Sequence, residues 1–332
     1  MLEPSLQLVG VICPTEALTR VIHCPMHAAS STSSTTSSPR NPRPRLLLQP
    51  RDLQVLEALV LGRCMSTTQL GRLFFPLKSG RVSPRARLRL AQLAALGLVR
   101  SIEQPQTRLD GRKAKVHFPT EKGRLLVASE LGHDPRDLPR VASTESSWSF
   151  LEHTLLCNDV RVLATLGAQT TSIHLIHWLP DYALRTLHMR SRPTQQGAGK
   201  GTAQGEGAII VPDGQWEVAA GASHHRFFLE ADRGTIPAVS TTKRRDWRSR
   251  VALYLAAERS GFMASLYGGH HFRVLTVVPN ASRLASLKAA TEEAGGRGRF
   301  WFAVGEDLSP ETFYTGEVWE VAGKTGRSRL LW

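Results

Sequence analysis

Three short helical patterns, each closed by proline or glycine, follow one another between residues 50 and 97, and they constrain the fold of this region most strongly. Large apolar residues recur in them at three- and four-residue intervals, the spacing of one buried helical face. Proline at the first helical position, serine as a cap and glycine beyond the last turn are ordinary helix boundaries. The expected boundaries are Pro50 for the first helix, Ser66 and Pro76 for the second, and Ser83, Pro84 and Gly97 for the third.

A hairpin signal follows the third helix in "LVRSIEQPQTRLDGRKAKVHF", where two strand-like arms flank Asp110-Gly111. Thr120 then opens a further helix that extends to about Leu131. Three helices followed by a hairpin is the element order of a winged helix-turn-helix, whose third helix enters the DNA major groove while the hairpin forms the wing. We therefore expect a winged helix-turn-helix at residues 46–131.

The third helix and the wing carry the side chains expected to contact DNA. Helix-turn-helix folds also serve as protein-docking modules, but the third helix is then usually less basic, so this helix and wing favour DNA. Because the helix arginines alternate by two, they do not all share one face. The leucines expected to face inward are Leu88, Leu90, Leu93 and Leu96. The expected DNA contacts are Arg85, Arg87, Arg89 and Gln92 on the helix and Arg108, Arg112, Lys113 and Lys115 on the wing.

The positive charge of the chain gathers in its first part. Residues 1–140 hold 21 Lys and Arg against 10 Asp and Glu, a net +11, whereas the remainder holds 21 against 18, a net +3. This polarity favours a polyanionic partner for the first part, with a well-solvated basic surface as the alternative. Residues 1–45 include "AASSTSSTTSSPRNPRPR", which has almost nothing to bury, and we expect a disordered tail or an overextended start there.

Cysteine spacing and hydropathy argue against a zinc-binding, disulfide-bonded or membrane-spanning protein. Cys13, Cys24, Cys64 and Cys157 show no C-x-x-C spacing, so they indicate neither a zinc site nor a disulfide framework. They fit a reducing compartment. No apolar run approaches the roughly eighteen residues of a membrane span. We therefore expect a cytoplasmic protein without a membrane partner.

The second half of the sequence predicts a mixed α/β (α+β) domain at residues 148–332, joined to the first by a linker at 132–147. Helical and strand patterns both occur along it, as such folds require. The expected helices cover residues 148–167, 247–264 and 281–294, and the expected strands cover 173–178, 207–212, 226–231, 272–278 and 299–305.

Three carboxylates accompany apolar strand patterns in this domain. The stretch "IIVPDGQWEV" runs an apolar strand into Asp213, and "FFLEADRG" carries Glu230, one spacer and Asp232. This spacing resembles the metal-dependent nuclease signature PD-(D/E)xK, except that Asp232 stands where the signature has a lysine. Carboxylate oxygens bind the Mg²⁺ or Mn²⁺ that phosphodiester hydrolysis uses. The structural alternative has Asp213 and Asp232 bonding turn amides, while Glu230, flanked by apolar residues, needs a partner or a metal.

Taken in order, six motifs resemble the bacterial replication-relaxation family: "LQPRDLQVLEALVLGRCMSTTQLGRLFFP", "RARLRLAQLAALGLVR", "FPTEKGR", "EHTLLCNDVRV", "PDGQWEV" and "FFLEADRGT". The resemblance covers about residues 46–280. It implies a winged-helix protein of plasmids and mobile elements with a carboxy-terminal α/β domain. The biochemical activity of that family is poorly defined, so the resemblance implies DNA biology more firmly than any reaction.

The helix, strand and helix order of the second domain is also similar to the restriction-endonuclease-like core. This second resemblance implies that Asp213, Glu230 and Asp232 bind Mg²⁺ or Mn²⁺, with Glu152 as the helix acid. Lys243 is the candidate to replace the missing lysine. The alternative is that Lys243 lies in a solvated basic turn and has no catalytic role. His153, beside Glu152, is more often a hydrogen-bonded core residue than a general base. The catalytic candidates are therefore Asp213, Glu230, Asp232, Lys243 and Glu152.

These patterns predict a DNA-binding protein of plasmid or mobile-element replication and maintenance, with a nuclease-like second domain. The first alternative is a Mg²⁺-dependent nickase or endonuclease, and the second is a non-catalytic regulator or adaptor. The expected partners are double-stranded DNA and a replication or transfer protein, and a homodimer stays open.

Overall fold

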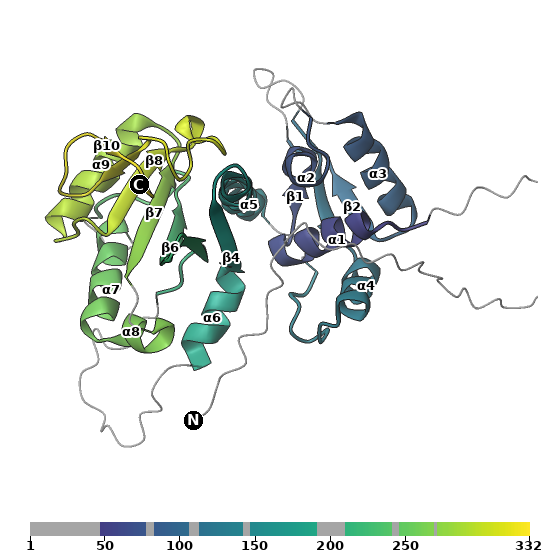
Figure 1. The fold of residues 1–332 in the computed structure, drawn as a ribbon, viewed down its shortest axis with the longest axis horizontal. Coiled ribbons are helices and arrows are strands. Elements are labelled where there is room, and N and C mark those ends of the chain that lie inside the picture. The colour runs from purple at the N-terminus through teal and green to yellow at the C-terminus, as the bar shows by residue number, and fades with distance from the viewer. Residues whose placement is uncertain are drawn as a thin grey trace, which may run out of the picture. The chain divides into compact units, whose positions relative to one another are not determined.

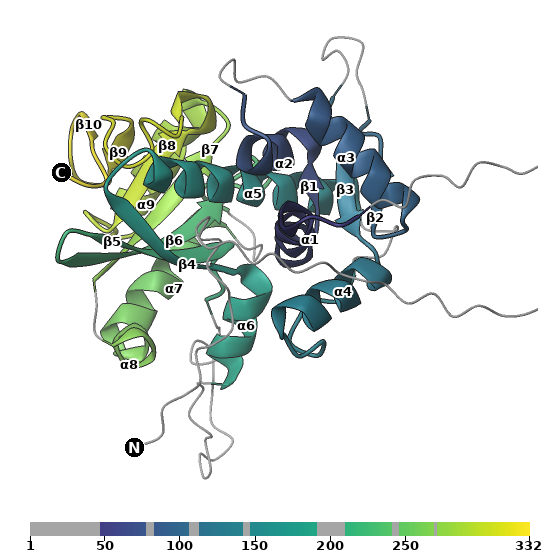
Figure 2. The same cartoon turned by 45° about the vertical axis from the view of Figure 1, so that its right-hand side comes forward.

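The structure of the protein is a computed structural model that describes residues 47–77, 83–105, 113–141, 147–190, 210–240, 246–268 and 271–332. The chain divides after Val141 into two compact units, and each is described by itself (Figures 1 and 2). The tail expected at residues 1–45, the loop tip that carries Arg108 and Arg112, and Lys243 lie outside the described residues.

The first unit has the element order that the motifs predict, three helices followed by an antiparallel pair of strands and a fourth helix. Its three short strands form one antiparallel sheet in the order β1-β3-β2. The sheet lies among the helices of this unit (Figure 1). The elements are α1 Pro50–Gly62, β1 Met65–Ser66, α2 Thr67–Phe74, α3 Pro84–Ala95, β2 Val99–Ile102, β3 Val116–Pro119 and α4 Glu121–Leu131.

Local sequence signals set the ends of these helices. The Ser66 side chain accepts a hydrogen bond from the backbone of Gln69, whose side chain accepts one from the Ser66 backbone, so the two residues form a capping box. The Thr120 side chain caps α4 by accepting a hydrogen bond from the Gly123 N–H. A Cβ on Gly123 would lie 2.3 Å from the Leu98 backbone oxygen, so only glycine lets α4 approach the start of β2 this closely.

The inward leucines of α3 are only partly as expected. Leu90 and Leu93 are buried, together with Ala86, whereas Leu88 is 62% exposed. Ala86, Leu90 and Leu93 are spaced by four and three residues and define the buried face, and Leu88 lies on the opposite side of the helix. The expectation that Leu88 faces inward was wrong because apolar character alone does not fix the phase of a helix.

The second unit is built on a seven-stranded mixed sheet in the order β10-β9-β8-β7-β6-β5-β4. Strands β4, β5 and β6 pair antiparallel, β6, β7 and β8 pair parallel, and the remaining pairs are antiparallel. Its helices are α5 Trp148–Gln169, α6 Asp181–Arg190, α7 Trp247–Arg259, α8 Phe262–Tyr267 and α9 Ala281–Glu293. Its strands are β4 Ile173–Pro180, β5 Gly214–Ala220, β6 Ser223–Ala231, β7 Phe272–Val278, β8 Phe300–Val304, β9 Trp319–Val321 and β10 Arg327–Ser328.

Helices cover both faces of this sheet and divide its core in two. Val160 and Ala164 of α5 pack with Trp216 on one face. On the other face, α7 and α9 pack with Phe228 and Phe302. Because side chains alternate along a strand, neighbouring residues of β6 face different helices. The order α5-β4-α6-β5-β6-α7-α8-β7 contains the helix, strand and helix order expected from the sequence, with α6 as an additional helix (Figure 2).

Two boundaries in this unit differ from those expected. Of the strand expected at 207–212, the described residues from 210 onward are not strand, and β5 instead begins at Gly214, after Asp213. Pro212 has no N–H to donate to a sheet. The helix expected at 247–264 is divided because Gly261 adopts a φ of 72°, so α7 ends before it and α8 begins after it.

Candidate functional site

Asp213 lies at the start of β5, where the backbone fixes its carboxylate. Its N–H donates to the Leu229 carbonyl at 2.9 Å, and its Oδ2 accepts from the Ala231 N–H at 2.8 Å. A Cβ on the following Gly214 would lie 3.0 Å from the Trp178 ring, so glycine lets the chain enter the sheet tightly here. The Asp213 carboxylate is therefore held against β6 by its own backbone neighbours.

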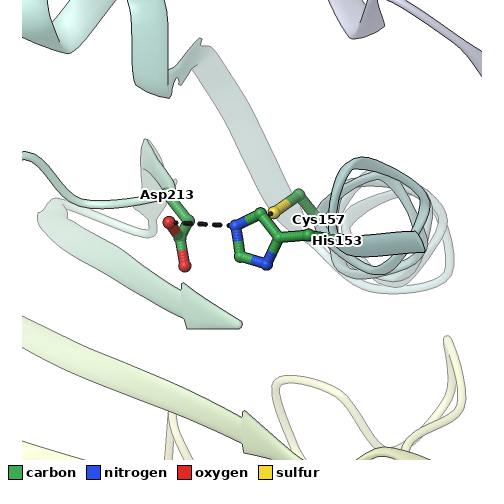
Figure 3. A group of neighbouring side chains, drawn as sticks. All are labelled: His153, Cys157 and Asp213. Atoms are coloured by element: carbon green, nitrogen blue, oxygen red, sulfur yellow. Dashed lines mark hydrogen bonds and ion pairs between the residues drawn. The ribbon is translucent and has the colours of Figure 1, made fainter. Parts of the chain in front are cut away.

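Two side chains of α5 meet Asp213. His153 and Cys157 are four residues apart and so share one helical face. The His153 Nε2 lies 3.2 Å from the Asp213 Oδ1 and 3.7 Å from the Cys157 Sγ (Figure 3). One ligand atom from each residue lies within 4.8 Å of the others, so these three side chains could hold a metal ion. All three are partly buried.

The carboxylates around this trio shift the pKa values of His153 and Cys157. The hydrogen bond that His153 donates to Asp213 raises the pKa of His153 above its ordinary value, although burial lowers it. Burial raises the pKa of the Cys157 thiol well above its usual range, and the negative charges of Asp213, Asp181 and Glu230 add to this effect. Cys157 is therefore a thiol, not a thiolate, when no cation is bound.

Glu230 lies inside the second unit and is 4% exposed. Its Oε2 accepts from the Arg250 Nε at 2.5 Å, and its Oε1 accepts from the Tyr254 hydroxyl at 2.6 Å. Burial raises the pKa of Glu230 to about 7, although the charge of Arg250 lowers it. Glu230 thus has the partner that its apolar neighbours required, and that partner is an arginine of α7.

Asp232 forms a bidentate ion pair with an arginine of α9. Its Oδ2 accepts from the Arg283 Nε at 2.7 Å, and its Oδ1 accepts from the Arg283 Nη2 at 2.8 Å. The Oδ2 also accepts from the Gly234 N–H at 3.0 Å. This is the bond to a turn amide that the sequence suggested as the alternative to metal binding. Both oxygens of Asp232 are therefore occupied by donors of the protein itself.

Glu152 has partners on its own helix and on the neighbouring loop. Its carboxylate forms an ion pair with Arg233 and accepts from the Trp148 Nε1 at 3.0 Å. Lys243 lies outside the described residues. Of the five catalytic candidates, only Asp213 belongs to the described group of side chains with metal-binding geometry.

The expected magnesium site is not formed in the structure. Such a site needs several free oxygen ligands around one point. Asp232 is engaged with Arg283, and Glu230 is engaged with Arg250, so a Mg²⁺ ion at these carboxylates would compete with two guanidinium groups. The residues therefore do not fit the three-carboxylate metal site that the sequence predicts.

On the first unit, the expected DNA contacts fall into two groups. Arg85 and Arg87 are exposed on α3. Arg89 instead forms a bidentate ion pair with Asp52 of α1, and its Nη1 donates to Gln92 at 3.0 Å. Arg89 and Gln92 are thus engaged within the unit.

Of the wing residues, Lys115 is exposed and its Nζ lies 2.9 Å from Glu103, in an ion pair open to solvent. Such exposed pairs are weak and exchange partners easily. Lys113 lies beside the wing tip, at the edge of the described residues, and makes an interaction of its own. Arg108 and Arg112 lie outside the described residues.

The sequence did not reveal the residues that pair with the carboxylates or lie beside them. The missed residues are Cys157, Arg250, Tyr254 and Arg283. His153 and Cys157 are four residues apart on a helix, a spacing that places two possible metal ligands on one face. A search for pairs of cysteines does not find it. No spacing in the sequence connects Arg283 with Asp232, because 51 residues separate them.

Comparison with known proteins gives one family. None of the curated proteins matches the chain. Among solved structures, one of the restriction endonuclease FokI is 12% identical with a TM-score of 0.21, covering 79% of this chain and 68% of that chain. One of FokI bound to DNA is 11% identical with a TM-score of 0.20, covering 76% and 66%. Likeness at this level carries no argument, so the fold assignment rests on element order and sheet register.

None of the described helices is long and apolar enough to cross a membrane. The family model of replication-relaxation proteins matches residues 56–265. The match begins in α1 of the first unit, ends in α8 of the second, and covers more than half of the chain. The chain therefore belongs to the replication-relaxation family.

Proposed function

We propose that this protein binds duplex DNA through α3 of its winged helix, in the replication and maintenance of a plasmid or mobile element. The observation that carries the proposal is the outer face of α3, where two exposed arginines have no described partner. Arg85 and Arg87 are both exposed, and neither side chain pairs with another residue in the described part of the chain. The family supports the replication context.

The shape of this face suits a DNA groove. Positions on an α-helix advance by about 100° per residue, so Arg85 and Arg87 lie near opposite edges of the outer face. Leu88 and Ala91 lie between them and are both exposed. A face with small and apolar residues at its centre and cations at its edges can approach bases while its edges reach phosphates.

Arg89 supports this face without belonging to it. Asp52 is fully buried, and the Arg89 guanidinium satisfies its carboxylate from α3. The pair fixes α3 against α1, so the exposed arginines are presented from a rigid helix. We therefore assign Arg89 a positioning role and Arg85 and Arg87 the contact role.

Cleavage by a three-carboxylate magnesium site is not the function that the geometry supports. Glu230 and Asp232 already have guanidinium partners, and the position of the signature lysine holds Asp232. Binding is therefore proposed as the function of the first unit, and the second unit is proposed to serve the same replication process through a partner protein.

Fluorescence anisotropy with a labelled duplex tests the contact role. The Arg85→Ala/Arg87→Ala double variant is expected to bind at least about tenfold more weakly than wild type at 100 mM salt, because it loses two phosphate or base contacts. Arg259→Ala is the matched control, since it removes an exposed arginine from α7 of the second unit. Equal affinity for wild type and the double variant, with both proteins folded, would contradict the proposal.

A further inference from the structure

We propose that His153, Cys157 and Asp213 form a binding site for a zinc-class divalent cation, with Zn²⁺ as its ion. The site lies where α5 faces the start of β5 (Figure 3). It differs from the expected magnesium site in two of its three ligands. The proposal concerns the second unit alone and holds whether or not the first unit binds DNA.

Two of the three distances within the trio are close to the edges of a zinc coordination tetrahedron. Zinc lies about 2.0–2.2 Å from nitrogen and oxygen ligands and about 2.3 Å from sulfur. Tetrahedral angles then place nitrogen about 3.4 Å from oxygen and about 3.6 Å from sulfur. In the protein the His153 Nε2 lies 3.2 Å from Asp213 and 3.7 Å from Cys157. The third edge, between Cys157 and Asp213, is at most 4.8 Å, and a bound ion would require it to shorten.

The charges around the trio favour a cation. Asp181 and Glu230 act electrostatically on both His153 and Cys157, in addition to Asp213 itself. Arg250 is already engaged with Glu230. A bound divalent ion would offset the remaining negative charge and would stabilise the Cys157 thiolate, which the surroundings otherwise disfavour.

The donor atoms select the ion. An imidazole, a thiolate and one carboxylate suit zinc, whereas Mg²⁺ takes oxygen ligands in an octahedron and keeps much of its water. Three protein ligands also leave a fourth position, the arrangement of zinc sites that keep one exchangeable ligand. The His153 side chain is 36% exposed and that of Asp213 is 20% exposed, so an ion has a path from solvent.

The same geometry argues against a cysteine nucleophile with a histidine base. In such a relay the histidine uses one nitrogen for the nucleophile and the other for the carboxylate. Here the Nε2 of His153 faces both Cys157 and Asp213. A sulfur and an oxygen close to the same nitrogen fit three ligands around one ion.

Cobalt substitution of the full chain tests the site directly. The metal-free protein is titrated with Co²⁺ and then Zn²⁺, in the presence of millimolar Mg²⁺. We expect one equivalent of Co²⁺ to give the visible bands of a tetrahedral complex and a thiolate-to-cobalt charge-transfer band, and Zn²⁺ to abolish both. This measurement needs no variant. A wild-type spectrum without the thiolate band would overturn the proposal.

Variants identify the thiolate. Cys157→Ser is expected to remove the charge-transfer band and to weaken Zn²⁺ binding by more than the roughly 10- to 100-fold that loss of an outer contact costs. Cys64→Ala is the matched control, because Cys64 is a buried cysteine of the first unit. Cys24→Ser is a second control, because Cys24 and His27 in "CPMH" are two metal-binding residue types close together in the sequence. If the band survives in Cys157→Ser and disappears in Cys24→Ser, the site is not the proposed one.

Calorimetry supplies a second readout. Zn²⁺ binding to a thiol releases its proton, so the binding enthalpy of the wild type should depend on the ionisation enthalpy of the buffer. Cys157→Ser should release fewer protons at the same pH, with circular dichroism showing that it is folded. Equal proton release by the two proteins would contradict a Cys157 ligand.

Discussion

At the scale of single residues, the three acidic side chains of the sequence motifs in the second unit have three different sets of partners. Asp213 faces His153 and Cys157, Glu230 is buried against Arg250, and Asp232 is paired with Arg283. The sequence places all three near strand ends, but their chemistry is decided by partners from α5, α7 and α9. A carboxylate in a motif is therefore a ligand only when the fold leaves its oxygens free.

The raised pKa of Glu230 predicts a pH dependence of stability. Its pKa rises from the ordinary 4.5 to about 7 in the folded protein, so the folded state binds the proton more tightly than the unfolded state does. The resulting stabilisation is complete below about pH 4.5 and is lost as the pH rises through about 7. Glu230→Gln has no carboxyl group to titrate at this position, so it serves as the reference.

Urea unfolding of wild type and Glu230→Gln at several pH values measures the effect. The free energy of unfolding of the wild type, relative to the variant, should fall between pH 5 and pH 8 by up to about 3 kcal/mol. The comparison cancels the titration of groups on which Glu230 does not act, and its charge raises the pKa of His153. A difference that stays constant, or that grows with pH, would show that Glu230 is not held as described.

The ion pairs of Glu230 and Asp232 also predict the behaviour of the protein toward DNA and magnesium. Chelator-treated wild type supplied with Mg²⁺ should nick supercoiled plasmid no faster than Asp213→Ala does, because Glu230 and Asp232 are already paired with arginines. Agarose gels over a time course measure the rate. Nicking by wild type that Asp213→Ala abolishes would restore the magnesium nuclease hypothesis.

At the scale of elements, prediction from the sequence succeeded where local signals act alone. Ser66, Pro84 and Thr120 mark helix starts through their own caps and ring geometry, and α2, α3 and α4 begin beside them. It failed where tertiary contacts decide. An apolar run before Pro212 predicts a strand, but the sheet register begins at Gly214, opposite Leu229.

The candidate site was less predictable than the fold for the same reason. Asp213 was found from its motif, whereas Arg283 and Arg250 reach the carboxylates from distant helices, and only the folded structure brings them together. No second cysteine lies near Cys157 in the sequence, so cysteine spacing alone gives no signal of a metal site there. Its partners are a histidine one helical turn away and an aspartate on another element.

The α1–α3 ion pair yields a stability prediction that separates Arg89 from Arg85. Arg89→Met leaves the Asp52 carboxylate buried without its partner and should destabilise the first unit by about 3 kcal/mol. Arg85→Met, at an exposed position of the same helix, should change stability by less than about 0.5 kcal/mol. Urea denaturation followed by circular dichroism measures both variants. Equal stability of the two would contradict the positioning role of Arg89.

At the scale of the whole molecule, charge and chemistry are divided between the two units. The net charge of +11 on residues 1–140 lies with the winged helix, whereas the clustered acidic side chains lie in the second unit. The family match extends across both. This division of charge agrees with the proposal that the first unit binds DNA.

The dependence of DNA binding on salt tests the central claim most directly. Anisotropy titrations of wild type with one duplex between 50 and 200 mM salt give the slope of log K against log salt. Three phosphate contacts predict a slope of roughly −2.7, and each arginine lost from Arg85 and Arg87 should reduce its magnitude by about 1. A slope near zero, or one that the double variant leaves unchanged, would contradict DNA binding through α3.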